Sequence, residues 1–82
     1  MTNEQIEKFL SNNRLNSLIR ISFKTRNAVC GIFIQTPDFD ELKSKNFWRI
    51  VSQADFESWQ KFKDYNLCRM FNGAEFTKLA IA

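Results

Sequence analysis

The sequence of 82 residues contains no histidine, and this absence removes much of the chemistry that enzymes use. Histidine is the commonest general base, a frequent zinc ligand and the usual partner of a nucleophilic serine or cysteine. The two cysteines, Cys30 and Cys68, lack CxxC spacing, and two glycines are too few for a phosphate-binding loop. The sequence therefore predicts a chain with no catalytic residues, no metal site and no cofactor.

Proline and long apolar runs are also scarce. The chain has one proline, and no apolar run approaches the roughly 20 residues that a membrane-spanning helix needs. The N-terminal residues 1–5 are polar and acidic, unlike a signal peptide. Both cysteines lie in apolar segments, which favours free thiols in a reducing compartment, with a disulfide as the alternative. We therefore expect a cytoplasmic protein that has no contact with a membrane.

What the sequence does contain is enough apolar material for one small domain spanning residues 1–82. Hydrophobic residues make up 44% of the chain, with nine phenylalanines and two tryptophans, which excludes a disordered protein. The formal net charge is +3, and the basic residues are spread along the chain. This balance permits binding of nucleic acid without requiring it.

The apolar pattern predicts one helix at the start and then strands. Ile6, Phe9 and Leu10 share one helical face, so we expect a helix over residues 3–14, with Thr2 or Asn3 as its N-cap. The remaining chain, residues 17–82, shows strand-like patterns. The expected strands are residues 18–24, 28–35, 47–51, 67–71 and 75–81.

The second expected strand is apolar on both faces, and Gly31 in its interior marks a bend or a bulge. Residues 38–46 form a charged connection without a clear period. Residues 54–64 are expected to form a short helix or helical turn, although a strand remains open. Asn72-Gly73 is typical of a tight turn and predicts a closing hairpin between the last two strands.

The expected fold class is α+β and mostly β. The N-terminal helix is followed by a small, strongly bent, five-stranded antiparallel barrel of Sm-like or SH3-like type. Closing such a sheet would protect strand edges that otherwise invite aggregation.

Three segments carry a family resemblance. They are the alternating strand that ends at Phe23-Lys24, the glycine-containing strand Val29–Phe33 followed by Asp38, and the segment Met70–Phe76 with its Asn-Gly pair. Together they resemble the Sm-like (Lsm) family over nearly the whole chain. The resemblance implies a bent barrel that assembles edge to edge into a ring and binds single-stranded, uridine-rich RNA at the pore. It places the base-binding loops at residues 38–40 and 72–73.

The sequence departs from the family pattern in the positions that read RNA. Asp40 and Leu42 stand where the family usually has an aromatic residue or histidine and an asparagine. Asn72 replaces the usual arginine or lysine before the glycine. These departures allow the fold to be shared without the RNA pocket.

Basic and aromatic side chains supply the candidate contacts. Lysine and arginine around residues 43–49 read either as a phosphate-binding patch or as ordinary solubilising charge, and the aromatic residues read either as a stacking platform or as core. Among the aromatic residues, Trp59 and Tyr65 are expected to be partly exposed. The candidate contact residues are Phe39, Lys43, Lys45, Arg49, Trp59, Tyr65, Asn72 and Gly73.

Three hypotheses about function follow. The first is a non-catalytic binding and assembly module that resembles Sm-like proteins, self-associates through strand edges and has single-stranded RNA as a candidate ligand. The second is an adaptor barrel that binds another protein and has no role with nucleic acid. The third is an accessory subunit of an enzyme whose catalytic residues lie on another chain.

Overall fold

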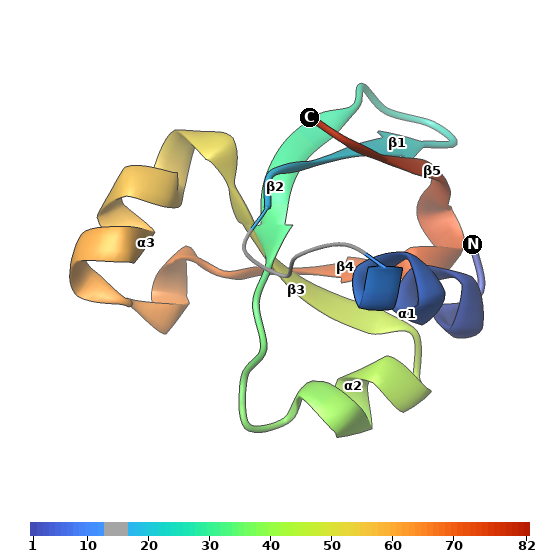
Figure 1. The fold of residues 1–82 in the computed structure, drawn as a ribbon, viewed down its shortest axis with the longest axis horizontal. Helices are drawn as coiled ribbons and strands as arrows, with labels where there is room; N and C mark the ends of the chain where they lie inside the picture. The colour runs from blue at the N-terminus through green and yellow to red at the C-terminus, as the bar shows by residue number, and fades with distance from the viewer. Residues whose placement is uncertain (13–16) are drawn as a thin grey trace.

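The computed structural model describes residues 1–12 and 17–82 as an α+β fold built on one five-stranded antiparallel sheet (Figure 1). The predicted N-terminal helix and the five antiparallel strands are confirmed. Along the sheet the strand order is β4-β3-β2-β1-β5. The helices and strands are α1 (Asn3–Asn12), β1 (Ile19–Phe23), β2 (Val29–Phe33), α2 (Phe39–Ser44), β3 (Phe47–Ser52), α3 (Phe56–Phe62), β4 (Arg69–Asn72) and β5 (Phe76–Ile81). Three 3-10 turns are η1 (Gln53–Asp55), η2 (Tyr65–Leu67) and η3 (Gly73–Glu75).

Helix α1 begins with a capping box formed by Thr2 and Gln5. The Gln5 amide donates to Thr2 Oγ1 at 3.2 Å, and the Thr2 amide donates to Gln5 Oε1 at 2.9 Å. The helix then runs to Asn12, whereas the predicted helix ended at residue 14, which lies outside the described residues. Ile6 and Leu10 are buried, as expected from their spacing.

Strand β1 lies between β2 and β5 and shows the predicted alternation. Ile19 and Ile21 are fully buried, whereas Arg20 between them is exposed. Ile19 is opposite Gly31 of β2 on one side and Ile81 of β5 on the other. The pairing of β1 with β5 therefore places the last strand of the chain beside the first.

Strand β2 changes partner at Gly31, the position at which a bend or a bulge was predicted. Gly31 pairs with Ile19 of β1 and also with Ser52 of β3, so the strand passes from one neighbour to the other. A Cβ atom at this position would lie 2.7 Å from the Val51 carbonyl oxygen. Glycine is required here because the backbone of β3 comes too close for any side chain.

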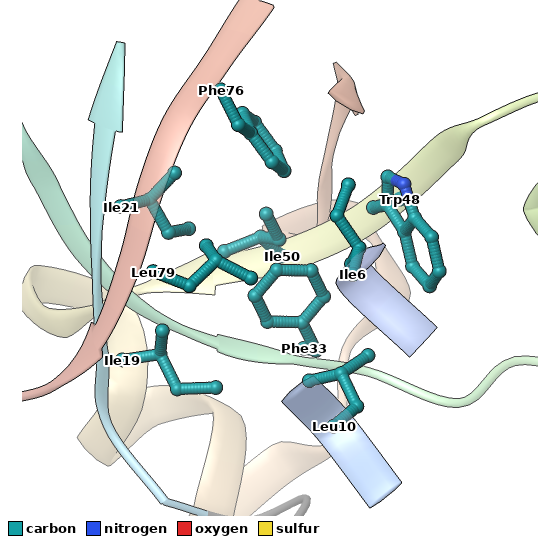
Figure 2. Close-up of a cluster of buried hydrophobic side chains, with 9 residues drawn as sticks. All are labelled: Ile6, Leu10, Ile19, Ile21, Phe33, Trp48, Ile50, Phe76 and Leu79. Carbon is teal, nitrogen blue, oxygen red and sulfur yellow. The ribbon is translucent and has the colours of Figure 1, made fainter. Parts of the chain in front are cut away.

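The apolar side chains form two clusters, one on each face of the sheet. Phe33 points into the inner cluster, whereas its neighbours Ile32 and Ile34 point into the outer one, so β2 is buried on both faces as predicted. Figure 2 shows the inner cluster, with Ile6 and Leu10 reaching in from α1. Its buried members are Ile6, Leu10, Ile19, Ile21, Phe33, Trp48, Ile50, Phe76 and Leu79. The outer cluster consists of Ile32, Ile34, Val51 and Trp59, the last supplied by α3.

The predicted closing hairpin is wrong. Strands β4 and β5 are joined by η3 and lie at opposite ends of the sheet, because β5 pairs with β1. Asn72 Oδ1 accepts from the Ala74 amide at 3.0 Å, and Gly73 does not adopt a positive φ, so the chain forms a 3-10 turn in place of a hairpin turn. In the described part of the chain the sheet is not closed into a barrel.

Residues 38–46 are not an irregular connection, because Phe39–Ser44 form helix α2. Asp40 and Glu41 lie in its first turn and Lys43 in its last, which suits the helix dipole. Phe39 and Leu42, three positions apart, are both half-buried. A helix of six residues is too short to show a period in the sequence.

The predicted helix at 54–64 is confirmed as η1 followed by α3. Ser52 and Asp55 hydrogen-bond to each other at 3.1 Å, and neither side chain caps the backbone as a capping box would. Lys63, with φ of 50°, ends the helix. No helix in residues 1–12 or 17–82 is long and apolar enough to cross a bilayer.

Candidate functional site

Asn46, which the sequence did not single out, connects the α2–β3 loop to η3. Its carbonyl accepts from the Gly73 amide at 2.8 Å, and its Oδ1 accepts from Trp48 Nε1 at 2.9 Å. Its Nδ2 donates to the Met1 carbonyl at 3.0 Å, and its φ of 62° is one that asparagine tolerates. One of the two loops that the family resemblance implicated, residues 72–73, therefore contacts the segment that joins α2 to β3.

Asn72 and Gly73 have structural roles at this junction. The Asn72 side chain caps η3, and Gly73 is buried, so a Cβ there would meet the side chains of Asn46 and Ile6. A ligand at this junction would find exposed polar atoms of Asn72 already engaged with the backbone. Position 72 itself carries no cation, but Arg26 lines the hollow beside Asn72, with its guanidinium carbon 5.8 Å from the centre of the Phe71 ring.

The predicted basic residues on and after α2 are all paired with carboxylates. Lys43 Nζ lies 3.3 Å from Glu7, and Lys45 Nζ lies 3.7 Å from Glu41. Arg49 Nη2 lies 2.9 Å from Asp38 Oδ2. A phosphate group would have to compete with these carboxylates, which weakens the case for a phosphate-binding patch.

Phe39 and Trp59, two of the aromatic candidates, pack against the fold. Phe39 is half-buried, with its ring 5.9 Å from that of Trp48 in an edge-to-face contact. Trp59 is only 8% exposed, so the expectation that it is partly exposed is wrong. Helix α3 lays Trp59 over Ile32 and Val51, where burial of a large ring stabilises the sheet. Neither ring offers a free face for stacking.

Tyr65 is 57% exposed, as predicted, and lines an open groove next to Arg49. The groove has a volume of about 380 Å³ and is also lined by Thr36, Pro37 and Asp38. Hydrogen bonds from Arg49 and Thr36 hold the pKa of the Asp38 carboxyl below its usual value. Arg49 Nε is buried and, among the residues that the structure describes, has no acceptor. The groove is therefore mostly apolar, with one fixed ion pair in its wall.

The two edge strands of the sheet, β4 and β5, carry backbone amide and carbonyl groups that no neighbouring strand satisfies within the described residues. Strand β4 pairs only with β3, and β5 pairs only with β1 within the described residues. Met70 on β4 is 49% exposed and Ile81 on β5 is 53% exposed, so each edge carries an apolar side chain. The Phe76 carbonyl accepts from the Met1 ammonium at 2.7 Å, which covers the start of the β5 edge. The rest of β5 is open.

The chemistry of the remaining polar groups is limited. Within residues 1–12 and 17–82, no three or more histidine, cysteine, aspartate or glutamate side chains lie close enough to hold a metal ion. Cys30 and Cys68 are free thiols, and burial raises the pKa of Cys68.

Comparison with known proteins adds no relative. No family model, curated protein or solved structure matches the chain.

Proposed function

We propose that the chain is a non-catalytic assembly module, with a strongly bent Sm-like or SH3-like sheet, that joins copies of itself through β4 and β5. The observation that carries this proposal is the pair of open edges at the two ends of one sheet. An open edge presents a row of unpaired amide and carbonyl groups, which another strand can satisfy.

The two edges differ, so pairing β4 of one copy with β5 of the next gives a head-to-tail contact. Such contacts repeat from copy to copy and close into a ring when the rotation allows it. Met70 and Ile81 stand at the two edges, and pairing would remove apolar surface of both from water. The edge-to-edge ring implied by the family resemblance is consistent with this arrangement.

Two substitutions test the proposal by mass measurement. Met70→Lys places a charge at the β4 edge, where it would face a β5 strand that already carries Lys78. We expect light scattering to report a multimer for the unchanged chain and a monomer for Met70→Lys, with the same circular dichroism spectrum. Phe62→Lys is the matched control, because Phe62 is 68% exposed and belongs to α3, not to an edge strand.

An unchanged chain that stays monomeric at the highest concentration reached would contradict self-association. A Phe62→Lys variant that dissociates as fully as Met70→Lys would show that the edges are not the contact.

Single-stranded RNA is a second candidate ligand for such a module. The hollow beside Asn72, which Arg26 and Phe71 also line, favours it, because the resemblance places a base-binding loop at residues 72–73. The ion pairs of Lys43, Lys45 and Arg49 favour a module without RNA. Binding of a labelled uridine-rich RNA that falls steeply with salt would support phosphate contacts, and no binding at low salt would exclude them.

A further inference from the structure

Strands β1 and β5 present an outward face that is distinct from the edges. Ile19, Ile21 and Leu79 point into the inner cluster, so the residues between them point outward. The register places Arg20 opposite Cys30 and Ala80, and Ser22 opposite Lys78, and opposite residues share a face. The outer β1–β5 face is defined by Arg20, Ser22, Cys30, Lys78 and Ala80.

This face is positively charged. Arg20 and Lys78 are exposed, and in the described part of the chain neither forms an ion pair. The strands β1, β2 and β5 contain no aspartate or glutamate. Lys43, Lys45 and Arg49, by contrast, are paired with carboxylates, so the two cations of this face are available to a partner in a way that those three are not.

The middle of the face has short side chains, and the helices α1 and α3 do not pack over it. Ser22 and Ala80 lie between the two cations, Cys30 lies on the other side of Arg20, and all three have small, half-buried side chains. Helix α3 covers the outer surface farther along, where Ile32 and Val51 lie beneath Trp59. Figure 1 shows α3 beside β2 and β3, away from β1 and β5, and α1 on the other side of the sheet. A partner could therefore approach the β1–β5 backbone closely.

We propose that the outer β1–β5 face binds an acidic segment of a partner protein. The guanidinium of Arg20 and the ammonium of Lys78 are matched by carboxylates, and the small residues between them leave room for a polypeptide backbone. The face has no aromatic side chain on which a base could stack, which favours an acidic polypeptide over single-stranded nucleic acid. Lys78 and Ala80 belong to the edge strand β5, but their side chains point out of the sheet, so backbone pairing of β4 with β5 would not bury the face.

The test uses a fluorescein-labelled peptide of alternating glutamate and alanine, measured by fluorescence anisotropy at low salt. Removing both cations in the Arg20→Gln, Lys78→Gln variant should weaken binding about tenfold, the sum of two modest surface ion pairs. The matched control is Lys8→Gln, Lys61→Gln, which removes the same charge from exposed positions on α1 and α3. The control should bind the peptide nearly as well as the unchanged chain.

Equal weakening in the two double variants would overturn the proposal, because binding would then depend on net charge alone. Labelled oligouridylate and vesicles containing phosphatidylserine are tested in parallel. The proposal would also be overturned if either probe bound more tightly than the acidic peptide and lost that binding in the Arg20→Gln, Lys78→Gln variant. The partner would then not be an acidic protein. By light scattering, the Arg20→Gln, Lys78→Gln variant should have the same oligomeric mass as the unchanged chain. Loss of peptide binding can then be distinguished from loss of self-association through the edges.

Discussion

At the scale of single residues, Gly31 controls where β2 leaves β1 for β3. A Cβ atom there would lie 2.7 Å from both the Val51 carbonyl oxygen and Ile50 Cγ2. The carbonyl belongs to the β3 backbone and cannot rotate away, so relief requires the two strands to separate. The sequence revealed this position because an interior glycine interrupts an otherwise apolar, β-branched strand.

Gly31→Ala should therefore lower the free energy of unfolding by about 1–3 kcal/mol, the usual cost of overpacking a core. Urea unfolding followed by circular dichroism measures the change. Ala28→Val is the control, because Ala28 is exposed just before β2 and its substitution should change stability by less than about 0.5 kcal/mol. A Gly31→Ala chain as stable as the control would disprove the close approach.

Asp38 provides a second prediction at the residue scale. Its pKa is lower in the folded chain than in the unfolded one, chiefly because Arg49 donates to its carboxylate. The pairing therefore stabilises the fold above the unfolded pKa and is lost as the pH falls through the folded value, below about pH 4. Arg49→Gln should raise the Asp38 pKa toward the usual value in an NMR titration of its carboxyl carbon. Identical titration curves in the two proteins would show that Arg49 does not set this pKa.

At the scale of elements, α3 stabilises the sheet through one large side chain. Trp59→Ala should lower the free energy of unfolding by about 3–5 kcal/mol, because it empties the outer cluster. Phe62→Ala, on the same helix but 68% exposed, should change it by less than about 0.5 kcal/mol. Equal effects of the two substitutions in urea unfolding would mean that α3 does not cover the sheet as described.

The helices and strands differ in how well they could be predicted from the sequence. Alternation along residues 19–23 predicted β1, and the two candidate caps, Thr2 and Asn3, predicted the start of α1, because both signals are local. Helix α2 was missed because six residues hold only Phe39 and Leu42 as an apolar pair. The partner of β5 was missed because the Asn-Gly pair suggests a local hairpin, whereas Leu79 and Phe76 pack best beside β1.

The candidate site was harder to predict than the fold. Lys43 pairs with Glu7, which lies on α1, and no local pattern announces a contact across that distance in the sequence. The burial of Trp59 likewise depends on where α3 packs against β2 and β3. The exposure of Tyr65 was predictable because η2 follows the left-handed end of α3 at Lys63 in a polar segment.

At the scale of the whole molecule, the fold is a sheet with an apolar cluster on each face and a free edge at each end. The inner cluster is covered by α1 and the outer one by α3, whereas β4 and β5 each keep a free edge within the described residues. An aromatic contact brings β1, the neighbour of β5, close to β4 on the inside, with the ring centroids of Phe23 and Phe71 lying 5.7 Å apart. Side chains of β1 and β4 are therefore in contact although the backbones of β4 and β5 do not pair, and the β4 and β5 edges remain available for another chain.

Amide hydrogen exchange of β4 and β5, followed by NMR in dilute and in concentrated solution, tests this central claim most directly. We expect the amides on the unpaired edges of β4 and β5 to exchange rapidly in dilute solution and slowly in concentrated solution, and the amides of β1 to exchange slowly in both. Slow exchange of β4 and β5 in the dilute monomer would mean that the two edges already pair within one chain. Rapid exchange at every concentration would mean that no second copy pairs with them.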